Sequence, residues 1–228
     1  MEQFSRSNLL IKEENTIKLN SKVVLLCGIG GVGSYVFESL VRMGVGTIII
    51  VDYDVVSISN INRQLIATHS TIGKYKVDVA KERALDINPK VNIIIHNTFI
   101  NDKTINDLFN YSIDYIVDAI DTVSAKLLLI EKAKELNIPI ISSMGTGNKL
   151  DPSKLKITDI SKTEYCPLAK VMRYELRKRN IKHLVVLTSS EVPIKIDVDD
   201  PKIIGSVSYV PSVGGLLISS KVINDLLL

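Results

Sequence analysis

A glycine-rich turn between two apolar segments constrains the fold of this chain more than any other feature. Val23–Leu26 are all apolar, which is typical of a strand buried on both faces of a parallel sheet. This run leads directly into Gly28-Ile-Gly-Gly-Val-Gly33, and an amphipathic helical pattern follows over residues 36–41. The spacing matches G-x-G-x-x-G, in which the glycines permit a tight turn and the helix N-terminus faces a bound phosphate.

Strand-like and helix-like segments then alternate along the chain. Strands are expected at 47–51, 91–95, 113–117 and 138–142, and helices at 71–87, 102–110 and 122–136. This alternation predicts right-handed crossovers and an α/β fold with a doubly wound, Rossmann-like, mostly parallel sheet. Beyond residue 147 we expect strands at 155–160, 184–187 and 205–210, helices at 167–180 and 213–228, and an exposed, mobile loop at 191–204. The chain is expected to form a single domain over 1–228, with its core at 20–147 and an elaborated C-terminal third at 148–228.

Composition excludes several classes of protein. The 228 residues are 46% hydrophobic and 23% charged, which is ordinary for a globular domain and excludes a disordered chain or a coiled coil. No apolar run approaches the roughly 18 residues of a membrane span, and the first 20 residues lack the apolar core of a secretory signal. The two cysteines cannot build a disulfide framework or a four-thiolate zinc site. We therefore expect a soluble cytoplasmic protein without a stable membrane span.

The residues after the second strand distinguish between kinds of nucleotide enzyme. Asp52 ends this strand 19 residues after Gly33, where dinucleotide-binding folds hold ribose hydroxyls. On these features alone, an NAD-dependent enzyme would be the default. Arg63 and Lys76 follow, however, and hydride transfer has no chemical need for such cations, whereas an enzyme that splits a triphosphate does. Solvated surface charges are the simpler alternative for both residues.

Two carboxylates follow the fourth predicted strand. Asp118 and Asp121 lie at its carboxyl end, where open α/β sheets bind ligands. A carboxylate there can hold Mg²⁺ between phosphate oxygens. The alternative for Asp121 is a structural role as the N-cap of the helix that Thr122 opens. Taken as an ordered set behind a glycine loop, these residues favour ATP and Mg²⁺ as ligands.

The order of these motifs resembles that of the ubiquitin-activating-enzyme-like adenylyltransferases, which include the molybdopterin- and thiamin-biosynthesis activating enzymes. The shared motifs, within residues 5–147, are Gly28-x-Gly-Gly-x-Gly33, Asp52-Tyr-Asp54, Asn60-Ile-Asn-Arg-Gln64, Gly73-x-x-Lys76 and Asp118-x-x-Asp121. The resemblance implies that ATP is bound by Gly28, Gly30, Gly31, Gly33, Asp52, Asp54, Asn60 and Gln64. It also implies that Arg63, Lys76, Asp121 and Arg6 are catalytic, with Asp121 binding Mg²⁺.

The N-terminus and the last third extend this resemblance. Arg6 resembles the arginine that dimeric members extend into the partner's ATP site, which implies a homodimer. Four segments resemble the branch of the family that dehydrates threonylcarbamoyladenosine in tRNA: 141–152, 163–169, 174–179 and 205–212. The implied enzyme adenylates the threonyl carboxylate on the adenosine beside the anticodon, and then closes a ring intramolecularly with release of AMP.

Activation of the C-terminal Gly-Gly of a ubiquitin-like sulfur-carrier protein is the main alternative, and the lack of paired C-x-x-C zinc ligands counts against it. A non-catalytic tRNA-binding scaffold is a further alternative. A protein partner from a sulfur-transfer system is also left open.

Positive charge is concentrated between Lys162 and Lys182, where seven basic and two acidic residues give a net charge of +5. The candidate tRNA-binding residues in this stretch are Lys170, Arg173, Arg177, Lys178 and Arg179, and the first three are expected to share one helical face. A solvated helix without a ligand is the alternative.

Two smaller features remain. Cys166, directly before Pro167, either intercepts the adenylate as a thiolate or only packs at a helix start, whereas Cys27 is expected in the core. The loop 144–147, with Asn148 and Lys149, is expected to shape the acceptor pocket, and its carbonyls are a candidate site for a monovalent cation.

Overall fold

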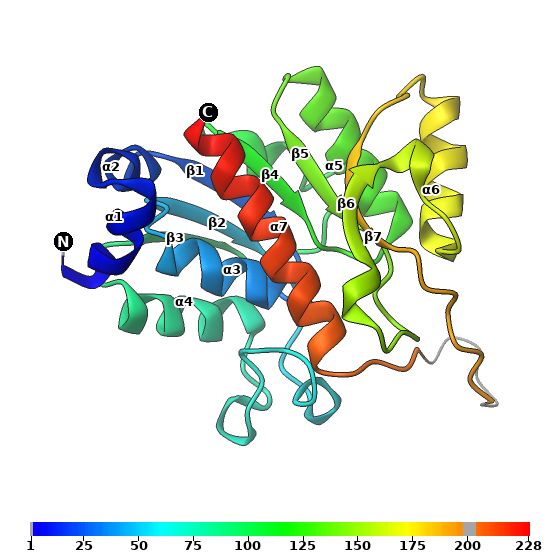
Figure 1. The fold of residues 1–228 in the computed structure, drawn as a ribbon, viewed down its shortest axis with the longest axis horizontal. Coiled ribbons are helices and arrows are strands. Elements are labelled where there is room, and N and C mark those ends of the chain that lie inside the picture. Colours follow the sequence, from blue (N-terminus) through cyan, green and yellow to red (C-terminus); the bar gives the residue numbers. More distant parts are fainter. Residues whose placement is uncertain (1, 198–203) are drawn as a thin grey trace.

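The computed structural model describes residues 2–197 and 204–228, and their strands form one seven-stranded sheet in the order β3-β2-β1-β4-β5-β7-β6 (Figure 1). The strands are β1 (Val23–Cys27), β2 (Thr47–Val51), β3 (Asn92–His96), β4 (Tyr115–Asp118), β5 (Ile140–Ser143), β6 (Leu155–Asp159) and β7 (Val185–Ser189). All neighbours pair in parallel except β6, which lies antiparallel to β7 at one edge. The predicted fold class is therefore confirmed.

Helices cover both faces of the sheet (Figure 1). The cores place α3 (Gly33–Arg42), α4 (Lys76–Ile87) and α7 (Tyr209–Leu227) on one face, and α5 (Val123–Glu135) and α6 (Pro167–Lys178) on the other. Because successive strand side chains point to opposite faces, β1 contributes Val24 and Leu26 to the first core and Leu25 and Cys27 to the second. Burial is the main cause of the raised pKa of the Cys27 thiol, with the neighbouring Asp118 charge second, and this fits the predicted core role.

The start of α7 packs closely on the glycine loop and the start of α3. A Cβ on Gly215 would lie 2.5 Å from the Val32 carbonyl oxygen, and a Cβ on Gly31 would lie 3.2 Å from Pro211 Cβ. Only glycine permits these approaches without displacement of backbone or ring atoms. The C-terminal third therefore forms part of the surroundings of the glycine loop.

The predicted strand at 205–210 is wrong. Residues 205–208 have no regular structure, and α7 begins at Tyr209, four residues before the predicted helix start. Gly205 instead pairs with Asn148, donating its N–H to Oδ1 at 2.7 Å and accepting the Asn148 N–H at 2.7 Å. Pro211 lacks an N–H but fits the first turn of a helix, where that N–H would have no intrahelical partner.

Other predicted boundaries also differ. The helix expected at 71–87 begins only at Lys76, because Gly73 turns the chain with a φ of 83°. The helix expected at 102–110 is reduced to a single 3₁₀ turn, Asn106–Phe109. The N-terminal helices α1 (Ser5–Ile11) and α2 (Glu13–Asn20) were not predicted. In the loop expected at 191–204, residues 191–197 carry no helix or strand, and 198–203 lie outside the described residues.

Across residues 2–197 and 204–228, the structure contains no helix with both the length and the apolar character required to cross a bilayer.

Candidate active site

A cavity of about 410 Å³ opens at the carboxyl edge of the sheet, beside the ends of β1 and β4. The strand order reverses between these two neighbours, because β2 and β3 lie beyond β1 in one direction and β5 lies beyond β4 in the other. Open α/β sheets bind their ligands at this switch point. The predicted ATP-site residues that line the cavity are Gly28, Gly30, Gly31, Asp52, Asp54, Asn60, Arg63, Gln64, Lys76 and Asp121.

The glycine loop has distinct requirements at each glycine. Gly28 has a φ of 91°, and a Cβ there would lie 2.7 Å from the Ala119 carbonyl oxygen. Gly33 does not line the cavity, but a Cβ there would lie 1.8 Å from the Gly28 carbonyl oxygen. A Cβ on Gly30 would meet nothing within 4 Å. The outer glycines therefore close the turn, while Gly30 keeps the cavity open beside the backbone.

Asp52 connects the end of β2 to the glycine loop. Its Oδ2 accepts the Ile29 N–H at 2.7 Å and its Oδ1 accepts the Asp54 N–H at 2.9 Å. A carboxylate offers about four acceptor positions, so these two bonds leave capacity for hydroxyl donors. The side chain is thus fixed against the glycine loop.

The two predicted cations differ in burial. Lys76 is only 4% exposed, and its Nζ lies 2.7 Å from Asp54 Oδ2. Because Lys76 is buried at the cavity, it is not a solvated surface charge. Arg63 is half-buried, and its Nη1 donates to the Ser59 carbonyl at 2.7 Å and to Asn62 Oδ1 at 3.0 Å. Both cations therefore stand in the cavity wall.

Asn60 and Gln64 use their side chains differently. Asn60 Oδ1 accepts the Ser57 N–H at 3.0 Å, so this amide stabilises the short helix Ile58–Asn60. Gln64 is 7% exposed, and its buried Oε1 has no hydrogen-bond partner in the part of the chain that the structure describes. An unpaired buried amide in a cavity wall costs free energy unless a ligand or water pairs with it.

Lys126 does not line the cavity but holds residues of its wall in place, and the sequence analysis did not predict this role. It is fully buried, and its Nζ lies 2.9 Å from Asp118 Oδ2, 3.0 Å from the Ile120 carbonyl and 2.9 Å from the Ser143 carbonyl. The three ammonium N–H groups thus connect the carboxyl end of β4 to the carboxyl end of β5. A lysine within the apolar stretch 125–130 was the available signal, because such a side chain needs a buried anionic partner.

Asp121 lies at the mouth of the cavity and is exposed. The N-cap of α5 is Thr122, so the capping alternative for Asp121 is wrong. Thr122 Oγ1 donates to Asp121 Oδ1 at 3.4 Å, which leaves most of the carboxylate free. Within the described ranges there is no cluster of three or more His, Cys, Asp or Glu side chains suited to a metal ion.

An aromatic pair and the loop after β5 form other walls. Tyr53 and Phe99 meet edge to face, with ring centroids 5.2 Å apart. The charge of Asp54 raises the pKa of the Tyr53 hydroxyl. Residues 143–147 line the cavity between β5 and α7. This surface leaves room for a second ligand beside the residues that are predicted to bind ATP.

Lys149 and Cys166 lie behind the loop 143–147. Lys149 is 3% exposed, and its Nζ donates to the Gly145 carbonyl at 2.6 Å. Burial lowers the pKa of Lys149, although the Cys166 and Glu191 charges oppose this shift. Cys166 is buried at the start of α6, and a Cβ on Gly145 would lie 3.5 Å from its Sγ. The thiol therefore packs against the loop, and it does not line the cavity.

Arg6 and the basic residues of α6 do not line the cavity of their own chain. Arg6 lies on α1, at the amino ends of the parallel strands, because Phe4, directly before α1, packs on Gly44, which stands between the end of α3 and the start of β2. On α6, Arg173 donates to the Thr163 carbonyl at 2.9 Å, while Lys178 and Arg179 pair with Glu175 at 3.0 and 2.8 Å.

The fold and the cavity are those of a nucleotide-binding α/β protein, with the cationic side chains of Arg63 and Lys76 in the cavity wall. The ThiF family model matches residues 4–218, and the chain therefore belongs to the ThiF family. It is 44% identical over 242 positions to the tRNA threonylcarbamoyladenosine dehydratase of Bacillus subtilis (strain 168), covering 100% of this chain and 95% of that one.

Two further proteins are similar to this chain. The crystal structure of Escherichia coli tRNA N6-threonylcarbamoyladenosine dehydratase in complex with ATP superposes with a TM-score of 0.92 at 27% identity, covering 99% of this chain and 93% of that one. The adenylyltransferase and sulfurtransferase UBA4 of Saccharomyces cerevisiae (strain RM11-1a) is 31% identical over 150 residues, which span 66% of this chain and 34% of that protein. The predicted family is thus confirmed.

Proposed function

We propose that this protein is an ATP-dependent dehydratase that cyclises N6-threonylcarbamoyladenosine next to the anticodon of tRNA. The observation that carries the proposal is the similarity to a dehydratase of that name over the whole chain, including the C-terminal third that borders the cavity. An enzyme with this substrate would work in the cytoplasm, where tRNA is modified. The cavity supplies the groups that the first chemical step requires.

ATP is proposed to lie across the glycine loop. The α3 N-terminus and the open space at Gly30 favour phosphate groups there. Asp52 accepts the ribose hydroxyls, and Arg63 and Lys76 balance the charge of the polyphosphate. The buried Oε1 of Gln64, which has no partner among the described residues, can accept one further hydrogen bond from the nucleotide.

The arrangement around Asp121 fits a magnesium ion. Mg²⁺ is commonly held by one or two carboxylates together with substrate phosphates, and Asp121 is an exposed carboxylate at the cavity with few competing partners. When bound, the ion would supply charge neutralisation between phosphate oxygens. A monovalent cation at the loop 144–147 stays a prediction.

The reaction needs two bond exchanges. The threonyl carboxylate oxygen attacks the α-phosphorus of ATP, and the bond to the bridging oxygen breaks to release pyrophosphate. The ureido nitrogen then attacks the activated carbonyl carbon and loses its proton, and AMP leaves with the electron pair of the C–O bond. Because ring closure is intramolecular, the protein's contribution there is positioning and exclusion of water by the loop 143–147. No protein nucleophile is required, which agrees with the packed position of Cys166.

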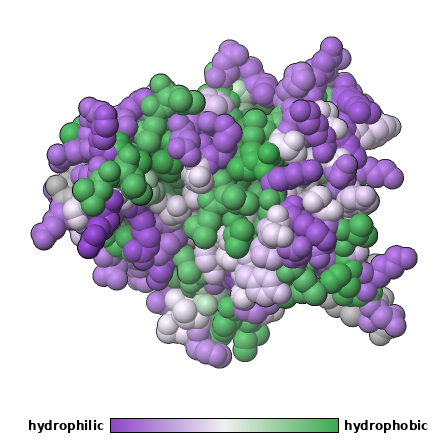
Figure 2. All heavy atoms as spheres, viewed as in Figure 1, coloured by the Kyte–Doolittle hydropathy of each residue, from purple (hydrophilic) through white to green (hydrophobic). Residues whose placement is uncertain are grey.

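A homodimer would complete the site. Arg6 lies at the wrong edge of the sheet to reach its own cavity, so only a second copy can supply it there. The neighbouring side chains Leu9 and Leu10 are 78% and 88% exposed, and hydrophobic residues also run along the outward side of α7 (Figure 2). Exposed apolar surface of this kind favours association.

Activation of a sulfur-carrier protein is the weaker candidate. The relative with sulfurtransferase activity in its name matches 66% of this chain, whereas the dehydratase of Bacillus subtilis matches all of it. A partner from a sulfur-transfer system stays a prediction.

The decisive experiment incubates threonylcarbamoylated tRNA with the protein and ATP–Mg²⁺, and measures the nucleosides by mass spectrometry. We expect a nucleoside lighter by one water, formed only with ATP. Asp121→Asn is expected to abolish product with folding intact, whereas Asp86→Asn, a matched change on the exposed side of α4, should leave turnover unchanged. An unmodified nucleoside from wild-type protein that still binds ATP would refute the dehydratase and favour the carrier-activating alternative.

A further inference from the structure

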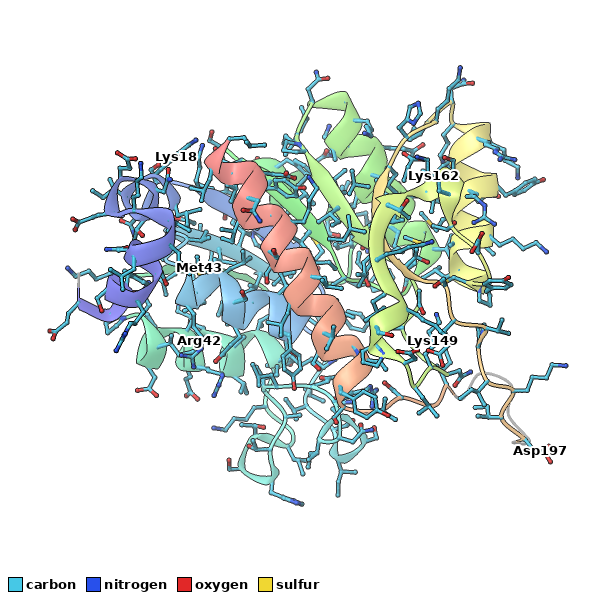
Figure 3. All side chains as sticks on the ribbon, in the orientation of Figure 1. Lys18, Arg42, Met43, Lys149, Lys162 and Asp197 are labelled. Carbon is cyan, nitrogen blue, oxygen red and sulfur yellow. The ribbon has the colours of Figure 1, made fainter. Side chains whose placement is uncertain are left out.

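The outward side of α6 carries three exposed residues in one row. Lys170, Tyr174 and Arg177 are exposed and stand at positions i, i+4 and i+7, which places them along a single helical face. We call this row the α6 stripe. Side chains of α6 project away from the sheet, on the same side of the molecule as the labelled Lys162 (Figure 3), and hydrophilic residues dominate that side (Figure 2).

Two cations of the stripe are free, in contrast to their neighbours on α6. Arg173 is half-buried against the Thr163 carbonyl, and Arg179 forms a 3.0 Å ion pair with Glu131 of α5. Lys170 and Arg177 make no side-chain hydrogen bond or ion pair with any residue of the described ranges. Three of the five basic residues expected to bind tRNA therefore hold the helix together, and two are available to an external anion.

Tyr174 gives the stripe an aromatic surface. It is 61% exposed, and Lys178 Nζ lies 4.1 Å from the centroid of its ring. Because Lys178 also pairs with Glu175 at 3.0 Å, the cation that covers the ring is itself fixed. A ring held in this way, and still exposed, is suited to stacking on a nucleobase.

The stripe starts close to the reaction cavity. Leu168, in the first turn of α6, lines the cavity, and the helix runs outward from there. At about 1.5 Å per residue, Arg177 lies roughly 14 Å beyond Leu168, a distance that a few linked nucleotides can span. An adenosine in the cavity would thus place its neighbours along α6.

We propose that the α6 stripe binds the unpaired nucleotides that flank the reacting adenosine, with Tyr174 stacked on a base and Lys170 and Arg177 on phosphates. The inference rests on the proposed function, because it takes the anticodon loop as the ligand. Unpaired RNA is favoured over a duplex because a tyrosine can stack only on a base that is not already stacked between its neighbours.

The test measures binding of an anticodon stem-loop RNA by fluorescence anisotropy over a series of salt concentrations. Tyr174→Leu should weaken binding roughly 5- to 150-fold, while Tyr174→Phe should bind as wild type because it keeps the ring. Lys170→Gln combined with Arg177→Gln should lower the slope of log K against log salt by about 1.4, two contacts at about 0.7 each. The charge-matched control is Lys90→Gln combined with Lys134→Gln, two exposed lysines at the amino ends of the parallel strands.

The outcomes separate this inference from the proposed function. Tyr174→Leu should raise KM for tRNA with kcat and ATP affinity unchanged, and a duplex lacking the loop should bind both proteins equally. If wild type dehydrates tRNA but the Tyr174 and Lys170/Arg177 variants bind and turn over like wild type, the stripe is not the RNA surface and the dehydratase stands. If wild type binds the duplex as tightly as the stem-loop, the single-strand assignment is wrong. If wild type neither binds the stem-loop nor dehydrates tRNA, both proposals fall.

Discussion

At the scale of single residues, alanine is expected to have different effects at two glycines of the same loop: it destabilises the fold at Gly33 and weakens ATP binding at Gly30. Gly33→Ala would push a Cβ to 1.8 Å from the Gly28 carbonyl, which must displace the backbone, whereas a Cβ on Gly30 meets nothing within 4 Å. We expect Gly33→Ala to lower the free energy of unfolding by about 1–3 kcal/mol or more. Gly30→Ala should change it by less than about 0.5 kcal/mol, yet weaken ATP binding on the order of tenfold because the methyl group occupies phosphate space.

Urea unfolding and calorimetric titration of ATP into both variants separate these effects. Equal loss of stability in the two variants would contradict the assigned geometry. Full ATP affinity in Gly30→Ala would show that the phosphates do not lie against that glycine.

Residues of the site were predictable where one local motif demands them. Gly28 opens the glycine motif directly after one apolar run, and Asp52 ends the next run at the expected spacing, so the motif alone was sufficient to predict both residues. Lys126 matters through contacts with segments distant in sequence, and Gln64, although its motif predicted it, has an unpaired buried oxygen that no motif shows. Such features arise only when the chain is packed, and the sequence carries little trace of them.

At the scale of elements, one carboxylate joins α3 to α4. Glu38 of α3 accepts from Arg83 of α4 at 2.7 and 2.8 Å and pairs with Arg42 at 2.7 Å. Burial alone would raise the pKa of Glu38, but hydrogen bonds from Arg83 and then Arg42 outweigh it, and the pKa is lowered. The folded state therefore binds this proton less readily than the unfolded state does.

The stabilisation from Glu38 is therefore complete above the ordinary glutamate range and is lost as pH falls through that range toward the lowered pKa. We expect Glu38→Gln to cost about 1 kcal/mol in the free energy of unfolding near neutral pH. That difference should shrink as the pH falls below about 4. Urea unfolding of both proteins at several pH values measures it, and a difference that grows on acidification would contradict this role of Glu38.

Elements were predictable where periodicity was strong and poorly predictable at their ends. Strands of the central sheet are short apolar runs and appeared within one or two residues of their expected positions. The N-terminal helices escaped prediction because they bury few side chains; in α2 these are Thr16 and Leu19. The segment 205–210 alternates small polar residues with Val and Tyr as a strand does, but Gly205 pairs with Asn148 and Pro211 fits the first turn of a helix, so no strand forms.

At the scale of the whole molecule, the cavity residues and Arg6 lie at opposite ends of the parallel strands. The glycine loop after β1 and Asp121 after β4 meet at the carboxyl edge, while α1 with Arg6 lies at the amino edge. No movement within one chain of this fold brings Arg6 across the sheet. If Arg6 is catalytic, it must act in the cavity of a second copy.

This geometry predicts complementation between two inactive proteins. Arg6→Ala and Asp121→Asn should each form inactive homodimers, because every site lacks one group. In a mixed dimer, the cavity of the Arg6→Ala chain keeps its own Asp121 and receives Arg6 from the partner, so one of the two sites is intact. Random mixing of equal amounts makes half of the dimers mixed, and activity should recover to about one quarter of wild type. Recovery is measured by loss of water from modified tRNA after subunit exchange. Mixing Arg6→Ala with Arg6→Leu should restore nothing, and a fully active Arg6→Ala protein would mean that the arginine, and the sharing of sites inferred from it, play no part in the reaction.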